Sequence, residues 1–176
     1  MKLIGSSTLN TLAKFVAKDN DRRALQAVAI IGNEVVATNG CILAKVTLPG
    51  EADTAPVLYI PTAKFKASEH PTITRSGDTV NLDTGYMVIK QDIFHDNYPD
   101  IDQIIPTTPP EFTIALSAEY LMILCELFKG SKNRDNIVTN YMELDFHGPT
   151  SSVVARGNTK HGEAITALIM PLRMNK

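Results

Sequence analysis

The chain has 176 residues, 44% of them hydrophobic and 20% charged, which is ordinary for a soluble globular protein with one large or two small domains. Its formal net charge of −2 excludes a strongly basic surface over the whole molecule, so any contact with nucleic acid must come from a local patch. With two cysteines, no apolar run of about 18 residues and no apolar signal-peptide core at the start, the sequence predicts a cytoplasmic protein without a disulfide framework or membrane span.

The first predicted elements are a strand over residues 2–5 and a helix that Ser6 or Ser7 caps. Apolar residues then follow at the spacing of one buried helical face: Leu9, Leu12, Ala13 and Val16. Lys14 and Lys18 fall on the opposite side of this helix, with Arg22 and Arg23 just beyond it. Two interpretations of these basic residues stay open: a solvated face, or a face that contacts phosphates.

Three strands are predicted next, over residues 25–31, 34–38 and 41–48. The pair Asn39-Gly40 separates two apolar runs, which predicts a tight hairpin turn with positive φ at both residues.

A second copy of the same order follows. Residues 49–56 read as a polar loop and 57–60 as a strand, and a short helix after Pro61 is expected to carry Lys64 and Lys66. Three more strands are predicted over 72–75, 79–82 and 86–91. The order strand, helix, three strands is therefore repeated.

The stretch YPDIDQIIP, residues 98–106, is predicted to be an extended connector because prolines fix φ and cannot donate to a sheet. Ile101, Ile104 and Ile105 are its expected anchors. The predicted organisation is a two-repeat domain over residues 1–97, a connector over 98–110, and a third repeat over 111–176.

In the third repeat, residues 111–116 are predicted to form a strand, Ser117 to cap a helix and Gly130 to end it. A wide apolar stripe indicates this helix: Tyr120, Ile123, Leu124, Leu127 and Phe128. Strands at about 137–146, 151–156 and 163–173 complete the chain. Three βαβββ repeats of about 50 to 65 residues predict an α+β fold.

Three motifs resemble the bacterial DNA sliding clamp, the polymerase III beta subunit. ATNGCILA resembles the clamp motif Ala-Thr-Asp-Gly-His-Arg-Leu-Ala, with Asn39, Cys41 and Ile42 as departures that reduce its charge. YPDIDQIIP resembles the clamp connector, and ALIMPLRM, residues 167–174, resembles the clamp's terminal strand. Clamps of this family have six βαβββ units in three domains, so the resemblance implies about one and a half clamp domains here.

The resemblance also implies an apolar pocket that binds short peptides of DNA polymerases and other replication proteins. Its expected residues are Leu25, Thr38, Gly40, Ile42, Leu43, Pro61 and Phe65 on one side, and Leu168, Ile169, Met170, Pro171, Leu172 and Arg173 on the other. Methionine and branched aliphatic residues suit such an adaptable surface. The alternative is that these residues are core between repeats.

A clamp surrounds double-stranded DNA with its helices, so the resemblance implies weak, non-specific DNA contact. The expected DNA-facing residues are Lys14, Lys18, Arg22, Arg23, Lys64 and Lys66. Glu119 and Glu126 on the third helix would reduce the attraction to phosphates.

Enzyme motifs are not found: the four histidines are scattered, and neither cysteine has an adjacent histidine. No catalysis, metal or cofactor is expected. The stretch from Gly157 to Gly162 is better interpreted as a hairpin connection than as a phosphate-binding loop.

Because the number of repeats is odd, the third repeat is expected to leave an apolar face for a second chain. The residues assigned to this face are Tyr120, Ile123, Leu124 and Phe128. A dimer would complete three domains, and a tetramer would supply the twelve units of a ring. The leading hypothesis is a processivity factor; the alternatives are a clamp-like adaptor that does not encircle DNA and a purely structural oligomer.

Overall fold

The computed structural model describes residues 2–18, 22–49, 53–62, 64–66, 71–92, 96–130 and 140–173. The chain forms two compact units, Met1–Ile105 and Pro106–Lys176, which are called unit 1 and unit 2 and are described separately. The boundary between them falls inside the predicted connector.

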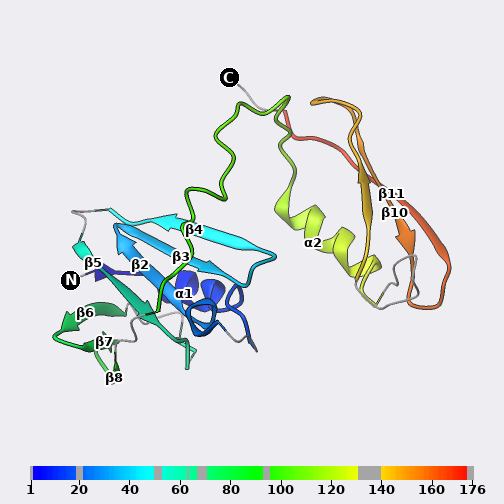
Figure 1. The fold of residues 1–176 in the computed structure, drawn as a ribbon. Helices are drawn as coiled ribbons and strands as arrows, with labels where there is room; N and C mark the ends of the chain where they lie inside the picture. Colours follow the sequence, from blue (N-terminus) through cyan, green and yellow to red (C-terminus); the bar gives the residue numbers. More distant parts are fainter. Residues whose placement is uncertain are drawn as a thin grey trace. The chain divides into compact units, whose positions relative to one another are not determined.

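Unit 1 contains two four-stranded antiparallel sheets and few helical residues (Figure 1). One sheet has the strand order β1-β6-β7-β8 and the other has the order β4-β3-β2-β5. The elements are β1 (Lys2–Leu3), α1 (Ser6–Leu12), the 3-10 helix η1 (Arg23–Gln26), β2 (Val28–Gly32), β3 (Glu34–Thr38), β4 (Leu43–Thr47), β5 (Asp53–Tyr59), β6 (Thr72–Ser76), β7 (Thr79–Asp83) and β8 (Val88–Asp92).

The two repeats of unit 1 exchange their first strands. β1, from the first repeat, pairs with β6 of the second, and β5, from the second repeat, pairs with β2 of the first. Each four-stranded sheet therefore contains three consecutive strands of one repeat and one strand of the other. This exchange holds the two repeats together as one domain.

One apolar core serves both sheets. Buried residues of α1, both sheets and the segment after β5 belong to a single cluster, which includes Leu12, Val35, Tyr59, Phe65 and Val80. Removing these side chains from water is the main stabilising contribution to such a domain.

The helix α1 is shorter than predicted. Gly5 occupies the N-cap position without a side-chain cap bond, so the expected serine cap is wrong, and Ser6 is the first helical residue. The helix ends at Leu12, so Lys14 and Lys18 lie beyond it rather than on its outer face.

The hairpin predicted at Asn39-Gly40 is present, but its turn type differs from the prediction. Thr38 pairs with Leu43, which leaves a four-residue loop, and only Gly40 has a positive φ, +90°. The Asn39 side chain explains this: its Oδ1 accepts from the amides of Cys41 and Ile42 at 2.9 and 3.0 Å. An asparagine that caps its own loop stabilises this longer turn.

The helix predicted after Pro61 is not formed over residues 61–62 and 64–66, and residues 67–70 lie outside the described part. The backbone of Phe65 instead bonds the side chain of Asn10 in α1. Asn10 Nδ2 donates to the Phe65 carbonyl at 2.7 Å, and the Phe65 amide donates to Asn10 Oδ1 at 3.0 Å. These two bonds satisfy backbone groups that a helix would otherwise use.

The start of the connector packs on the outer face of the sheet that contains β2 and β5. Tyr98 contacts the small buried cluster on that face, and its hydroxyl donates to the Val36 carbonyl at 3.4 Å. Ile101 is buried, as expected of an anchor, but Ile104 and Ile105 are exposed. Both of their amides donate to the Ile101 carbonyl, so the connector turns here instead of staying extended.

The partly buried hydroxyl of Tyr98 gives the stability of the protein a dependence on alkaline pH. Burial raises the pKa of Tyr98 to about 12, whereas an unfolded tyrosine titrates near pH 10. The folded state holds this proton more tightly, so the contribution to stability is complete below about pH 10 and is lost towards about pH 12. Urea unfolding curves of Tyr98→Phe should lose part of this decline; a decline as steep as in the unchanged protein would contradict the prediction.

In its described residues, unit 2 consists of one helix against one three-stranded antiparallel sheet (Figure 1). The elements are α2 (Ala118–Leu127), β9 (Glu143–Asp145), β10 (Val153–Asn158) and β11 (Ala164–Ile169), in the sheet order β11-β10-β9. Ser117 is the N-cap of α2, as predicted, and its Oγ accepts from the Tyr120 amide at 3.3 Å.

Residues 111–116 do not form the strand that was predicted for them. The third repeat therefore has the order helix, three strands in the described residues. The first and last of these strands are shorter than expected, whereas β10 has the expected length but begins two residues later. Residues 137–139 of the first of them lie outside the described part. The hairpin connection predicted after Gly157 is present: the Thr159 amide donates to the Glu163 carbonyl at 2.8 Å.

The core of unit 2 is small. Its buried residues are Leu124, Phe128, Val153, Ala155 and Ile169. The expectation that four residues of α2 face a second chain is thus wrong for Leu124 and Phe128, because both side chains pack inside their own unit. Tyr120 and Ile123 are exposed.

Candidate functional site: an apolar groove in unit 2

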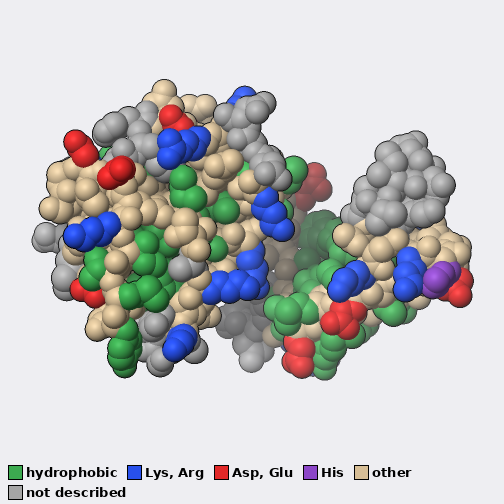
Figure 2. All heavy atoms as spheres, turned by 90° about the horizontal axis from the view of Figure 1, so that it is seen from below, with side chains coloured by type: hydrophobic (Ala, Val, Ile, Leu, Met, Phe, Trp, Pro, Cys, Tyr) green, Lys and Arg blue, Asp and Glu red, His purple; other side chains and the backbone are tan. Residues whose placement is uncertain are grey.

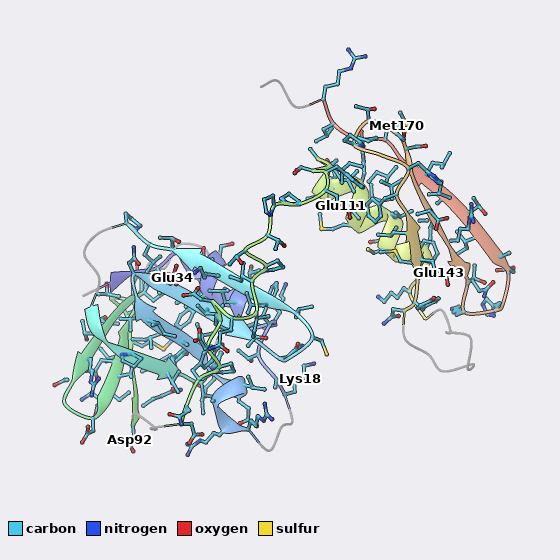
Figure 3. The ribbon with its side chains drawn as sticks, turned by 45° about the horizontal axis from the view of Figure 1, so that its top comes forward. Lys18, Glu34, Asp92, Glu111, Glu143 and Met170 are labelled. Atoms are coloured by element: carbon cyan, nitrogen blue, oxygen red, sulfur yellow. The ribbon has the colours of Figure 1, made fainter. Side chains whose placement is uncertain are left out.

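An apolar groove of about 510 Å³ lies between α2 and the end of β11. Tyr120, Ile123, Leu124 and Leu127 line it from the helix, and Ala167, Leu168, Ile169, Met170, Pro171 and Leu172 line it from the strand and the residues after it. Figure 3 labels Met170 at the end of β11. None of the described side chains that line the groove is charged.

The geometry of the two elements explains why apolar groups are exposed here. Along β11, side chains alternate between the two faces of the sheet, so Ile169 enters the core while Leu168 and Met170, 64% and 66% exposed, point outward. On α2, Tyr120, Ile123 and Leu127 follow the spacing of one helical face. Beyond the strand, the Leu172 amide donates to the Ala115 carbonyl at 2.8 Å, which fixes the groove's end.

Residues of two separately predicted sites, the peptide pocket and the face for a second chain, line this one groove. Leu168, Met170 and Leu172 were predicted to bind peptides, and Tyr120 and Ile123 were predicted to contact a second chain. The structure places all five around one concave surface. The prediction omitted Leu127 and Ala167, although Leu127 belongs to the apolar stripe that indicated the helix.

Seven of the predicted pocket residues belong to unit 1, and three of these seven are buried. Leu25 and Phe65 are each 6% exposed, and Thr38 is 5% exposed, so these side chains are not accessible to a ligand. The Thr38 hydroxyl donates to the Ile42 carbonyl and so stabilises the β3–β4 loop. Gly40 and Ile42, in this loop, are exposed. Leu43 and Pro61 are half-buried. Of the predicted residues in unit 2, Arg173 is exposed and Pro171 is half-buried.

All six residues predicted to face DNA are exposed: Lys14, Lys18, Arg22, Arg23, Lys64 and Lys66. The hydrogen bonds between Asn10 and Phe65 hold the segment that contains Lys64 and Lys66 beside α1. Asn10 lies four residues before Lys14 in the sequence. Figure 2 shows one face of unit 1, on which basic side chains are scattered and acidic ones lie among them. This distribution suits weak electrostatic attraction better than a specific contact.

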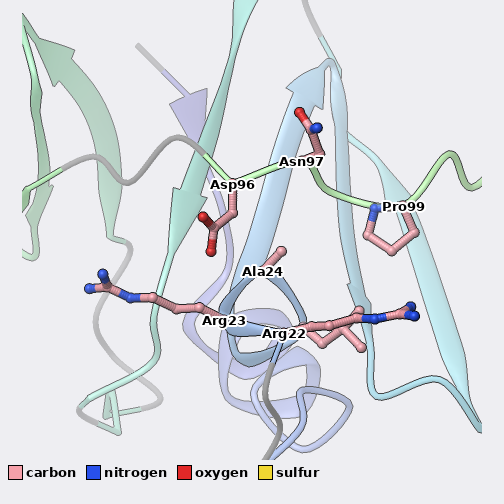
Figure 4. Close-up of a pocket in the computed structure, with 7 residues that line it drawn as sticks. Arg22, Arg23, Ala24, Asp96, Asn97 and Pro99 are labelled. Atoms are coloured by element: carbon pink, nitrogen blue, oxygen red, sulfur yellow. The ribbon is translucent and has the colours of Figure 1, made fainter.

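A second hollow, of about 320 Å³, lies in unit 1 between η1 and the segment before the connector. Figure 4 shows Arg22, Arg23 and Ala24 of η1 and its flank opposite Asp96, Asn97 and Pro99, with the two guanidinium groups directed to opposite sides. Because the two guanidinium groups diverge, they do not form one anion-binding site.

Within the described residues, no group of three or more His, Cys, Asp or Glu side chains is arranged to hold a metal ion. None of the described helices is long and apolar enough to cross a membrane.

The interlocked repeats, the single-helix third repeat and the α+β composition define a protein with the DNA sliding-clamp fold. Solved structures of DNA polymerase III beta chains superpose on 97–99% of this chain. No protein-family model matches the sequence, and no curated protein matches it.

Three solved structures illustrate the likeness. The DNA polymerase III beta chain of Streptococcus pneumoniae has a TM-score of 0.70 and 20% identity, over 97% of this chain and 49% of its own. The sliding clamp of Pseudomonas aeruginosa, solved with a ligand, has a TM-score of 0.71 and 14% identity, over 99% and 51%. That of Bacillus subtilis has a TM-score of 0.68 and 17% identity, over 97% and 48%. The chain thus spans about half the length of these clamps.

Proposed function

We propose that the protein is a sliding-clamp-like processivity factor that contacts double-stranded DNA and binds replication proteins through the groove of unit 2. The observation that supports this most directly is the exposed apolar groove at the end of β11, on the motif that resembles the clamp's terminal strand. The protein would act by position and not by catalysis, holding a polymerase near DNA.

The groove suits a short peptide with leucine and phenylalanine ends. Its lining is aliphatic, with Met170 as an adaptable side chain and Tyr120 as a flat one. Burying each apolar anchor of the peptide contributes about 1.5–3 kcal/mol. Two such anchors are enough for roughly micromolar affinity after the cost of ordering the peptide.

Retention on circular DNA tests the processivity role. A chain that assembles into a ring should stay on nicked circular DNA at a salt concentration that removes it from the same DNA after linearisation. Light scattering under the same conditions gives the number of chains in the complex. Equal loss from both DNA forms would contradict encirclement.

The alternative function is an adaptor that binds clamp-interacting peptides without encircling DNA. The observation that favours it is the weak basic character of unit 1, where acidic side chains lie among the basic ones (Figure 2). Peptide binding with no DNA binding at low salt would establish this alternative instead of the processivity role.

DNA affinity is expected to come from Lys14 and Lys18, both exposed after α1. Changing both to glutamate should abolish binding to duplex DNA in fluorescence anisotropy at low salt, because each change replaces an attraction to phosphate by a repulsion. Arg75→Glu with Lys90→Glu, also exposed, makes the same change in net charge elsewhere and should retain much more affinity. Affinity that is insensitive to salt, or equal losses in both pairs, would contradict the prediction.

A further inference from the structure

We infer that Asn10 is a positioning residue for the DNA contact: it holds the segment that carries Lys64 and Lys66 close to Lys14, so that lysines of both repeats of unit 1 form one phosphate-binding patch. The inference rests on the proposed contact with double-stranded DNA. Asn10 carries no charge, and the sequence gave no reason to place it among the DNA-facing residues. Its role follows from the groups that its side chain bonds and from its position on α1.

The Asn10 side chain bonds both backbone groups of Phe65. Its Nδ2 donates to the carbonyl at 2.7 Å, and its Oδ1 accepts from the amide at 3.0 Å. The two residues are 55 positions apart and belong to different repeats, so these bonds join the repeats at a place where no strand does. A side-chain amide that donates and accepts at one residue fixes the direction of that backbone as well as its position.

Phe65 passes this fixed position on to its neighbours. Its ring is 6% exposed and belongs to the main core of unit 1, whereas Lys64 and Lys66 on either side of it are exposed. The ring therefore holds the backbone from the core, and Asn10 holds it from α1. Both lysines extend towards solvent from a backbone that is held at their common neighbour.

A second side-chain amide holds the start of the same stretch. Gln91, in β8, donates to the Ile60 carbonyl at 2.7 Å and accepts from the Ile60 amide at 3.0 Å. Ile60 directly follows β5, and residues 61–62 and 64–66 belong to neither a helix nor a strand. Backbone groups outside regular structure need other partners, and here Gln91 and Asn10 provide them at two points.

Asn10 and Lys14 are neighbours on one face of the first helical segment. α1 ends at Leu12, but the chain continues in hydrogen-bonded turns, because the amides of residues 13–15 donate to carbonyls three or four residues earlier. Residues four apart in such turns lie next to each other on the surface. The bonds from Asn10 to Phe65 therefore bring the two lysines of the second repeat close to Lys14.

This grouping strengthens an attraction that acts only over short distances. At physiological salt the Debye length is about 8 Å, so lysines must be held near one another to act on the same stretch of phosphates. Without the Asn10 side chain, the amide and carbonyl of Phe65 would lose their partners and turn to water. The segment would then leave its place beside Lys14, and DNA would have to order it again on binding.

Asn10→Ala should weaken the binding of the full chain to duplex DNA at low salt by about threefold or more, because the lysines are no longer ordered in advance. Fluorescence anisotropy measures this change. The slope of log K against log salt should become less steep by about one, as for the loss of a phosphate contact. In a chain with Lys64→Ala and Lys66→Ala, adding Asn10→Ala should change the affinity no further, which separates positioning from a general loss of stability.

Thr84→Ala is the matched control. The Thr84 hydroxyl also bonds backbone groups within unit 1, where it accepts from the amides of Tyr86 and Met87 at 3.4 and 3.2 Å. Its removal should lower the free energy of unfolding and leave the DNA affinity unchanged. Gln91→Ala releases the other end of the segment and should weaken DNA binding as Asn10→Ala does. It also tests the inference if Asn10→Ala does not fold.

The outcomes separate this inference from the function on which it rests. A wild-type chain that does not bind duplex DNA at low salt would overturn the DNA contact itself. Wild-type binding with unchanged affinity in Asn10→Ala and Gln91→Ala would overturn the positioning role alone. An equal effect of Asn10→Ala with and without the two lysines, or an equal loss in Thr84→Ala, would also overturn it.

Discussion

Met170→Ala combined with Leu172→Ala is expected to weaken the binding of a peptide with leucine and phenylalanine ends by at least about tenfold. Both side chains line the groove of unit 2 and are more than half exposed, so their truncation removes ligand contacts and little core. A tenfold loss corresponds to about 1.4 kcal/mol, which is less than the value of burying one apolar anchor. Calorimetry with the full chain measures the change.

Met87→Ala with Val88→Ala provides the matched control for this pair. Met87 and Val88 are also exposed apolar residues, 49% and 51%, but they belong to the β7–β8 hairpin of unit 1. This pair should leave the peptide affinity unchanged. If wild-type protein releases no heat and shows no saturable binding with such a peptide, the groove is not a peptide site.

Local signals predicted much of the fold. The Ser117 cap, the apolar stripe after it and the Asn39-Gly40 hairpin each depend on interactions within a few residues, and all three are present. The repeated element order depends only on recognising such elements in sequence. The α+β class and the clamp fold could therefore be predicted from the sequence.

Long-range pairing was not predictable in the same way. Nothing local in β1 or β5 indicates that each joins the sheet of the other repeat, because that choice depends on partners about 30 to 70 residues away in the sequence. The same dependence explains residues 111–116. Their composition suits a strand, but their chain offers no described strand for them to join.

The sequence indicated some of the residues that line the groove of unit 2 and missed others, for a physical reason. Alternation along β11 identifies Leu168 and Met170 as a pair on one face, but it does not say which face is covered. On α2, apolar residues surround most of the helix, so periodicity alone did not separate the buried Leu124 and Phe128 from the exposed Ile123. Leu124 and Phe128 are buried because they pack against Val153 and Ala155 of the sheet.

The largest loss of stability is expected from Phe128→Ala. Phe128 is 1% exposed and is the largest side chain in the five-residue core of unit 2, so its removal leaves a cavity that few neighbours can fill. Substitutions of this kind cost about 3–5 kcal/mol. Urea unfolding of the full chain, followed by a probe in unit 2, should report this destabilisation.

Gly157→Ala is the companion change, because the ring of Phe128 lies directly over this glycine. A Cβ at position 157 would lie 2.9 Å from Phe128 Cε1 and 3.1 Å from the Tyr141 carbonyl oxygen. Alanine usually stabilises a strand relative to glycine, but here overpacking should cost about 1–3 kcal/mol.

The two changes should not be additive. Once Phe128→Ala has removed the ring, an added methyl group at position 157 loses its two closest contacts and keeps the one with the Tyr141 oxygen, so Gly157→Ala should cost less than it does in the wild-type protein. The four unfolding free energies of this double-mutant cycle measure the coupling. Equal costs of Gly157→Ala in both backgrounds would mean that the ring does not press on the glycine, and that the core of unit 2 is packed differently around α2 and β10.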